Sequence, residues 1–192
     1  MATVNSYTRM VPTPDRTSLD AIIAAASDLL EQTGLAGVTM QAVALRVGVR
    51  APSLYKRVPS RERLIQLVAE ATITQLAGRL NAAVGPVELA DTLRKIGHER
   101  PAAFQLIMTP GPGVPAVGDE FRLAASAAIL RVAAELAGEE HALEAARTFT
   151  AWAAGFISME LNGGFGLGGD VNRAWEFGVA RIIEAITATP VV

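Results

Sequence analysis

The sequence predicts an all-α protein, in which an N-terminal three-helix module of the helix-turn-helix kind precedes a larger helical bundle. Three observations support this prediction. Apolar residues recur at steps of three and four along most of the chain. No segment alternates apolar and polar residues as a half-buried strand would. Glycine and proline cluster where one helical pattern stops and the next begins.

The composition narrows the class of protein. A chain of 192 residues, 51% hydrophobic and 19% charged, can form one sizeable core or a small module joined to a larger one. Because cysteine is absent, disulfides, thiolate metal sites and thiol nucleophiles are excluded. The sequence contains no apolar run of about eighteen residues and no secretory signal pattern. We therefore expect a cytoplasmic protein with no membrane partner.

The N-terminal helices can be placed from their end signals. Residues 1–16 show no periodicity, and we expect a flexible arm there. Ser18 can cap a first helix whose apolar face continues to about Gly34. Thr39 can cap a short second helix, and Gly48 stands where a left-handed residue would end it.

The remaining helices follow the same logic. A third short helix is predicted from about Arg50 to just before Pro59, and Ser60 can cap a fourth helix that reaches about Leu80. Five further helices are predicted over residues 88–99, 101–108, 116–137, 139–161 and 171–188. The chain then divides into an arm (1–16), a helix-turn-helix domain (17–64) and a C-terminal domain (65–192).

Charge is distributed unevenly along the chain. From Arg46 to Arg63, six basic residues face the single acid Glu62, a local charge of +5. From Ala71 onward, nine basic residues face thirteen acidic ones, a local charge of −4. A compact cationic patch on an otherwise acidic protein can bind phosphates without binding every surface it meets. An ordinary solvated face is the alternative.

The segment 41–58 has the pattern of a DNA-reading helix pair. An apolar stripe that can hold the second helix comprises Val43, Val47, Val49, Ala51, Leu54 and Val58. The opposite side carries Pro52, Ser53, Lys56 and Arg57. Small residues near the start of this helix would let its backbone approach base edges, whereas the cations would meet phosphates.

The run from Thr39 to Leu64 resembles the N-terminal domain of the tetracycline-repressor (TetR) family. The anchors in family register are Thr39, Val43-Ala44, Gly48-Val49, Leu54-Tyr55, Ser60 and Leu64. The resemblance covers about residues 18–69. It implies base-edge contacts from Gln41, Pro52 and Ser53, and phosphate contacts from Thr39, Tyr55, Lys56, Arg57 and Arg61. Ala51 and the additional cation Arg50 complete the expected DNA-binding set. Arg57 and Val58 depart from the usual His and Phe, yet they keep a phosphate donor and an apolar plug.

The same resemblance implies that the C-terminal bundle holds a homodimer interface and a cavity for a small effector. Residues 151–161 resemble a subclass with a Trp-His-Gly signature, but Ala154 stands where the His would be. Dimer contacts are expected from the last two helices through Phe149, Phe156, Trp175, Phe177 and Ile182. The expected cavity lining is Phe104, Ile107, Met108, Phe121, Trp152 and Met159, for each of which core packing is the alternative. Few charges lie nearby, so a largely apolar or aromatic effector is expected.

Together these features predict a transcriptional regulator, a repressor that binds double-stranded operator DNA and is released by its effector. Paired reading helices would meet half-sites about 34 to 36 Å apart.

The sequence also offers two other classes of function, an enzyme and an interaction or lipid-binding module. An enzyme could use the glycine pattern of residues 164–169, which matches a dinucleotide fingerprint, but a helix and not a strand precedes it. His98 and His141 lack ligand spacing or a partner nucleophile, so no catalytic residue, metal or cofactor is expected. A helical interaction or lipid-binding module that kept the fold but lost operator recognition stays open.

Overall fold

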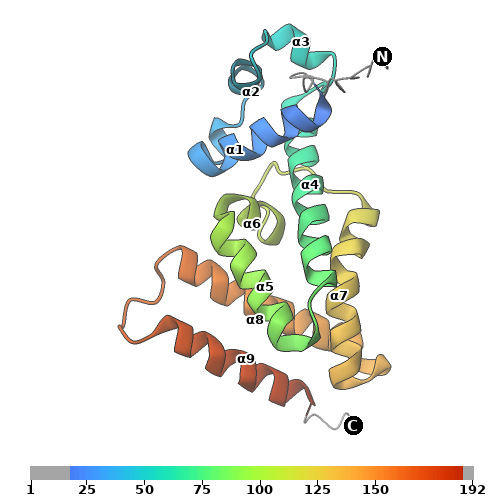
Figure 1. The fold of residues 1–192 in the computed structure, drawn as a ribbon, viewed down its shortest axis with the longest axis vertical. Helices are drawn as coiled ribbons and strands as arrows, with labels where there is room; N and C mark the ends of the chain where they lie inside the picture. Colours follow the sequence, from blue (N-terminus) through green and yellow to red (C-terminus); the bar gives the residue numbers. More distant parts are fainter. Residues whose placement is uncertain (1–17, 188–192) are drawn as a thin grey trace, which may run out of the picture.

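The computed structural model describes residues 18–187, and within this range it contains helices but no strand. The expected arm, residues 1–16, lies outside the described residues. Figure 1 shows an elongated molecule with the first three helices at one end and the last two long helices at the other. The all-α prediction is confirmed.

The N-terminal helices begin where their capping residues predict. Their bounds are α1 (Leu19–Gly37), α2 (Met40–Val47), α3 (Ala51–Tyr55) and α4 (Arg61–Asn81). The hydroxyl groups of Ser18, Thr39 and Ser60 each accept a hydrogen bond from the backbone N–H three residues later, at 3.2, 3.1 and 3.1 Å. These bonds satisfy amides that have no partner within the helix.

The end of α1 differs from the prediction. The helix was expected to stop near Gly34, which does leave helical geometry with a φ of 68°. The chain resumes a helical turn after it and ends only at Gly37. A glycine can adopt this left-handed value without the clash that a Cβ would create, so the helix bends at Gly34 and continues.

The bundle helices are α5 (Gly85–Glu99), α6 (Pro101–Met108), α7 (Asp119–Ala137), α8 (Ala142–Leu161) and α9 (Val171–Thr187), with a 3-10 turn η1 (Glu139–His141). The helix α5 begins three residues earlier than predicted, because Pro86 fits a first turn that needs no amide donor. The helix α7 begins later, at Asp119 rather than Ala116. The predicted helix from Glu139 is split, because its first residues form η1.

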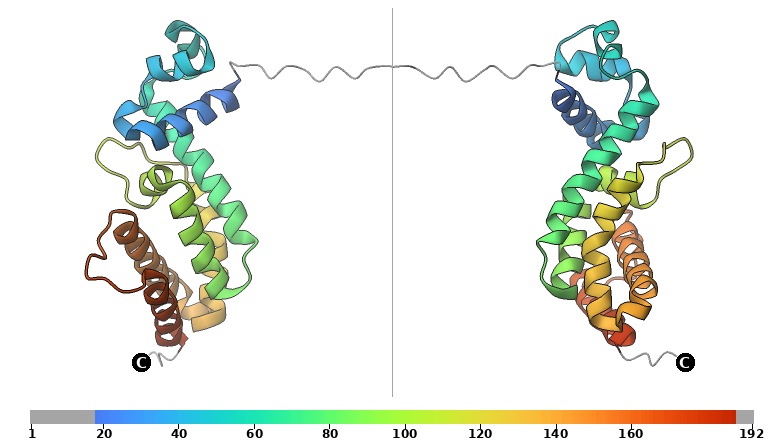
Figure 2. Two further views of the ribbon diagram at one scale, coloured as in Figure 1. Left: turned by 60° about the vertical axis from the view of Figure 1, so that its left-hand side comes forward. Right: turned by 90° about the vertical axis from the view of Figure 1, so that its right-hand side faces the viewer.

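Two buried clusters form the interior. The first joins α1 to α4 and also includes Ala103 and Leu106 of α6. The second fills the bundle around residues such as Phe149 and Trp175. The helix α4 contributes to both, with Leu64 at its start and Leu80 near its end. Figure 2 shows α4 running from the N-terminal helices down into the bundle.

Candidate nucleic-acid interface

The turn between α2 and α3 is held by backbone geometry. Gly48 ends α2 in the left-handed conformation, with a φ of 77°. The next amide, on Val49, donates to the Ala44 carbonyl at 2.9 Å. The chain then enters α3 with Pro52 in its first turn. This arrangement fixes the two short helices as a helix-turn-helix unit.

The predicted apolar stripe is confirmed. Val43, Val47, Leu54 and Val58 are buried, and Val49 and Ala51 pack partly buried against the same cluster. The short helix α3 is thus held by Leu54 within it and Val58 after it. A helix of 5 residues would be marginal in water on its own, so this packing stabilises it.

The residues predicted to meet DNA lie mainly on the outside of this unit. Eight of the ten are exposed, namely Thr39, Gln41, Arg50, Pro52, Ser53, Tyr55, Lys56 and Arg57. Within α3, Pro52 and Ser53 belong to the first turn, and neither side chain fills the core. Ala51 is half-buried beside them. The first turn of α3 therefore offers a small, open backbone surface.

The cations of the charged segment fall into two groups. Arg46 lies 2.9 Å from the Gln32 side-chain oxygen and 3.6 Å from the Asp28 carboxylate, both on α1. Arg63 pairs with the buried Glu70 at 3.2 Å. By contrast, Arg50 and Lys56 are exposed. Within residues 18–187, neither of these side chains has a hydrogen bond or ion pair. The unpaired charge therefore flanks and follows the first turn of α3.

Arg61 is placed differently from its predicted role at a phosphate. Its guanidinium donates from Nε to the Val38 carbonyl at 2.7 Å and from Nη2 to the Leu35 carbonyl at 2.6 Å. These carbonyls lie at the end of α1, directly before the Thr39 cap of α2. Arg61 thus ties the start of α4 to the α1–α2 connection. The sequence showed only a positively charged residue directly after the Ser60 cap, and from this the prediction was an exposed cation that contacts phosphate.

A second contact missed by the sequence prediction joins α1 to α6. The Glu31 carboxylate accepts hydrogen bonds from the backbone amides of Ala102 and Ala103, at 3.0 and 2.9 Å. The same carboxylate lies 3.4 Å from Nε of Arg100. An acid at a helix N-terminus satisfies free amides and complements the helix dipole. Glu31 therefore caps a bundle helix from within the N-terminal domain.

Only two of the six residues predicted to line an effector cavity are brought together at one hollow. Ile107 and Met108 do line a hollow of about 640 Å³ between α4, α6, α7 and α8. Trp152 stacks on Trp175 in the core, with ring centroids 5.1 Å apart. Met159 is 50% exposed. The other two separate as well, because Phe104 is buried and borders a different hollow, whereas Phe121 is half-buried in the first turn of α7.

The hollow at α7 and α8 has other lining residues. Its walls are mostly small and aliphatic, and its remaining members are Ile73, Leu76, Arg122, Ala125, Ser126, Ile129, Leu130, Leu143, Ala146, Arg147, Thr150, Ala151 and Ala154. The prediction favoured aromatic residues because of their bulk. The six α8 members, Leu143, Ala146, Arg147, Thr150, Ala151 and Ala154, lie on one helix face at spacings of three and four, which is the sequence signal for this wall.

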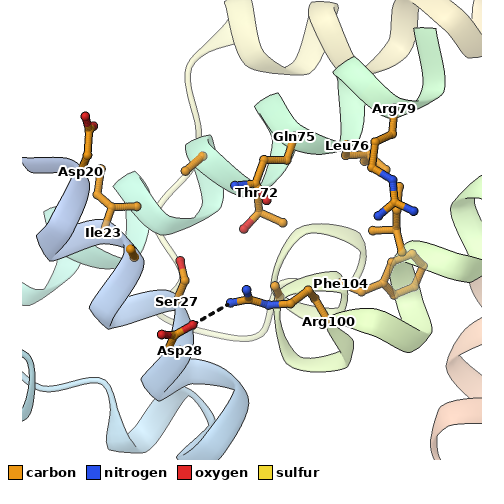
Figure 3. Close-up of a pocket in the computed structure, with 14 residues that line it drawn as sticks. Asp20, Ile23, Ser27, Asp28, Thr72, Gln75, Leu76, Arg79, Arg100 and Phe104 are labelled. Carbon is orange, nitrogen blue, oxygen red and sulfur yellow. Dashed lines mark ion pairs between the residues drawn. The ribbon is translucent and has the colours of Figure 1, made fainter. Parts of the chain in front are cut away.

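A smaller hollow of about 330 Å³ lies between α1, α4, α5 and α6. Figure 3 shows the Arg100 side chain extending toward Asp28. Their nearest charged atoms are 3.8 Å apart. Arg79, on the α4 side, pairs with Glu99. Both arginines on this hollow thus have an acidic partner.

The predicted dimer residues separate into buried and exposed members. Phe149 and Trp175 are 4% and 2% exposed, so they pack inside their own chain. The Trp175 indole N–H also donates to Asp91 at 2.7 Å. Phe177 is 69% exposed. Phe156 and Ile182 are half-buried against the bundle core. The aromatic spacing that suggested an interface therefore serves the chain's own core at most of these positions.

The features considered for an enzyme have structural explanations. Residues 164–169 lie in the connection between α8 and α9, with no strand before them. His98 contacts the Glu160 carboxylate at 3.0 Å. Within residues 18–187, no group of three or more His, Asp or Glu side chains is placed to hold a metal ion. No described helix is long and apolar enough to cross a membrane.

Comparison with known proteins identifies the family. A sequence model described as "Bacterial regulatory proteins, tetR family" matches residues 22–68. A second, described as "Tetracyclin repressor-like, C-terminal domain", matches residues 87–182. An uncharacterized HTH-type transcriptional regulator from Mycobacterium tuberculosis is 28% identical over 169 residues, which are 81% of this chain and 75% of that protein. The Trp-His-Gly subclass stays a prediction.

Solved structures agree with this result. A regulatory protein designated SCO4313 is 25% identical, with a TM-score of 0.75 over 88% of this chain and 97% of that one. BioQ, solved with its natural double-stranded DNA operator, shares the fold at 21% identity, with a TM-score of 0.60 over 88% of this chain and 98% of that one. The matched models, the curated relative and the helix-turn-helix geometry show that this chain belongs to the tetR family of bacterial regulatory proteins and is a DNA-binding transcriptional regulator.

Proposed function

We propose that this regulator is a homodimeric repressor that binds its operator through α2 and α3 and releases it when a small, largely apolar molecule fills the hollow between α4, α6, α7 and α8. The observation that carries the proposal is the course of α4. Leu64 and Ile65 of α4 pack in the DNA-binding core, whereas Ile73 and Leu76 line the hollow. A ligand that displaces α4 at the hollow acts on the same helix that supports α2 and α3.

Two further contacts support this coupling. Ala103 and Leu106 of α6 pack in the N-terminal core, and Ile107 and Met108 line the hollow. Glu31 of α1 caps the first turn of α6. Both helices that border the hollow on this side therefore reach the DNA-binding domain. A ligand that favours a different position of α4 and α6 opposes DNA binding by its differential affinity for the two states.

The proposed DNA contacts follow from exposure and chemistry. Gln41 in the first turn of α2 and Ser53 in the open first turn of α3 are exposed, uncharged polar side chains, so we assign them to base edges, together with backbone approach at Ala51 and Pro52. The phosphate contacts are assigned to Thr39, Arg50, Tyr55, Lys56 and Arg57. The protein acts in the cytoplasm, where bacterial DNA is accessible, and no enzymatic activity is proposed.

The proposed dimer uses the outer faces of α8 and α9. Phe177 on α9 and Met159 on α8 are 69% and 50% exposed. On α8, the exposed residues Thr148, Gly155 and Ala151, which also borders the hollow, recur at steps of three and four. Small residues at this spacing let a second helix approach closely, and dimerisation gives the two-fold symmetry that paired half-sites require.

Sedimentation velocity at micromolar concentration tests the dimer. The wild-type chain is expected to sediment as a dimer, and Phe177→Ser should shift the equilibrium toward the monomer. Leu167→Ser is the matched control, because Leu167 is an exposed apolar residue in the α8–α9 connection, outside both helix faces. A wild-type monomer, or equal effects of the two variants, would contradict the proposed interface.

A mobility-shift titration tests operator binding and release. Duplexes from the DNA flanking the gene are titrated with wild-type protein and with the double variant Ser53→Ala, Lys56→Ala. We expect one or more duplexes to bind the wild-type dimer about 1,000-fold or more tightly than unrelated DNA, and the double variant to lose this preference. A compound found by thermal-shift screening should then release the duplex. Binding of that compound in the hollow without any change in operator affinity would contradict the release mechanism while leaving DNA binding intact.

A further inference from the structure

We infer that the effector of this regulator is an amphipathic anion, an apolar body that carries one carboxylate, and that Arg147 binds its acid group. This inference rests on the proposed effector site and adds the chemical class of the ligand. It starts from the charges of the hollow between α4, α6, α7 and α8. Its lining contains two arginines, Arg122 and Arg147, and no aspartate or glutamate.

The two arginines are in different states. The Arg122 guanidinium is bound to the Asp119 carboxylate and, at 3.1 Å, to the Val117 carbonyl. Arg147 is exposed, and across residues 18–187 its guanidinium has no hydrogen bond or ion pair. It is therefore an uncompensated cation at the rim of an apolar hollow, with donors arranged in a fork that matches a carboxylate.

The rest of the lining fits the apolar part of such a ligand. Ile107, Met108, Ile129 and Leu130 come from α6 and α7, and Ile73 and Leu76 from α4. The volume of about 640 Å³ falls within the range of about 300 to 1,000 Å³ typical of small-molecule sites. Thr150 on α8 lies one helical turn from Arg147 and can add a hydroxyl donor to the same acid group.

The other hollows offer no comparable combination. In the hollow of Figure 3, Arg79 and Arg100 are paired with Glu99 and Asp28, and two acids share the lining. Near α5 and α9, Arg94 is held by the Glu160 carboxylate. At either place a ligand carboxylate would meet acidic side chains in the lining, and it would have to displace an existing partner to bind the arginines. At Arg147 it would displace only water.

The test is calorimetric titration of the DNA-free dimer with probes that share an apolar body and differ in the head group. Decanoate, 1-decanol and decylamine form one series, and 2-naphthoate and 2-naphthol a second. The proteins are the wild type, Arg147→Gln, Arg147→Lys and, as control, Arg173→Gln, which replaces another exposed arginine, on α9, whose side chain has no hydrogen bond or ion pair within residues 18–187. Circular dichroism melting checks that each variant is folded.

At least one carboxylate is expected to bind the wild type about five- to tenfold more tightly than its alcohol, a range between that of exposed and of desolvated ion pairs. Arg147→Gln should abolish this preference, whereas Arg147→Lys should keep part of it and Arg173→Gln all of it. Four results would overturn the inference. Acids and alcohols could bind equally, or the amine could bind more tightly than the acid. The preference for the acid could survive in Arg147→Gln, or neither carboxylate could show saturable binding.

A separate arm measures operator affinity with and without the carboxylate that binds. If the carboxylate binds selectively but leaves operator affinity unchanged, the result supports an anionic ligand and refutes operator release through this hollow. Release by a neutral compound, without binding of either acid, would support the release mechanism and refute the ligand class.

Discussion

Replacing Arg61 separates two roles that an arginine can have beside DNA. The structure assigns its guanidinium to the Leu35 and Val38 carbonyls, at 2.6 and 2.7 Å, and not to the outer surface. We predict that Arg61→Ala weakens DNA binding because the α1–α2 connection, and with it the Thr39 cap of α2, loses its support. The number of phosphates neutralised by the protein should stay the same.

The magnitude follows from the two bonds. A hydrogen bond from a charged group contributes about 1.5 to 3 kcal/mol, but this site is only partly buried, so water can replace some of the loss. We expect a decrease of about 1 to 2 kcal/mol in the free energy of unfolding of Arg61→Ala. We take about half of this loss in stability per subunit to appear as weaker DNA binding by that subunit. The free energy of DNA binding by the dimer then becomes less favourable by about 1 to 2 kcal/mol, which is a decrease in affinity of about 5- to 30-fold. Arg61→Lys keeps the charge but not the fork, so it should recover only part of both quantities.

The assay is DNA affinity by fluorescence anisotropy across a range of salt concentrations, combined with urea unfolding. Each phosphate contact contributes a slope of about −0.9 to the dependence of log affinity on log salt. Lys56→Ala, the control, should reduce the magnitude of the slope by about 1.8 for a dimer and leave the free energy of unfolding unchanged within about 0.5 kcal/mol. Arg61→Ala should keep the wild-type slope. The reasoning would be refuted if Arg61→Ala reduced the slope as Lys56→Ala does while its unfolding curve matched that of the wild type.

Three further predictions follow from other parts of the molecule. Ser53→Ala should relax base preference at one position of each half-site, at a cost of about 1 to 3 kcal/mol on the preferred duplex, and an equal loss on every duplex would reassign Ser53 to backbone contact. The hydrogen bond from Arg94, followed by that from His98, lowers the pKa of Glu160 below its ordinary value. The ionised Glu160 carboxylate therefore stabilises the fold fully above the pKa that Glu160 has in the unfolded chain, and this stabilisation is lost as the pH falls through the pKa of Glu160 in the folded protein. Urea midpoints from pH 7 to pH 3 should fall more steeply for the wild type than for Glu160→Gln, and parallel curves would count against this ion pair. Gly178→Ala should lower the free energy of unfolding by about 1 to 3 kcal/mol, because its Cβ would lie 2.3 Å from Cζ2 of Trp152, and an unchanged thermal midpoint would show that the ring moves freely.

The sequence predicted the features that local chemistry decides. Ser18, Thr39 and Ser60 cap the helices they were assigned to, and Gly48 adopts the left-handed conformation at the end of α2. Each of these depends on hydrogen bonds or steric limits within a few residues. The inward stripe of the helix-turn-helix unit was also predictable, because helical periodicity places its members on one face.

Contacts between distant segments could not be read from such patterns. Glu31 caps the first turn of α6 although 71 and 72 residues separate it from the two amides it binds. Arg61 reaches back 23 and 26 residues to the end of α1. Both depend on how α1 packs against α4 and α6, which periodicity does not specify.

The aromatic residues of the bundle show the same limit. Spacing places Phe149 and Trp175 on apolar helix faces, but it does not distinguish a face that packs in its own core from one that meets a second chain. The structure buries both of them within the chain and leaves Phe177 exposed. Four of the six residues expected to line the cavity lie elsewhere for a related reason, because bulky side chains fill space and the hollow forms where α7 and α8 carry small ones, such as Ala125 and Ala151.

The most direct test of the central claim, that α2 and α3 read operator DNA, is selection of bound duplexes from a random library by the wild-type protein and by the double variant Ser53→Ala, Lys56→Ala. The account predicts that the wild type enriches a two-fold symmetric motif whose half-sites are about one helical turn apart, and that the double variant, with an unchanged melting curve, does not enrich it. Enrichment of the same motif by both proteins would show that other residues read the DNA. Failure of the wild type to enrich any motif would contradict the account itself.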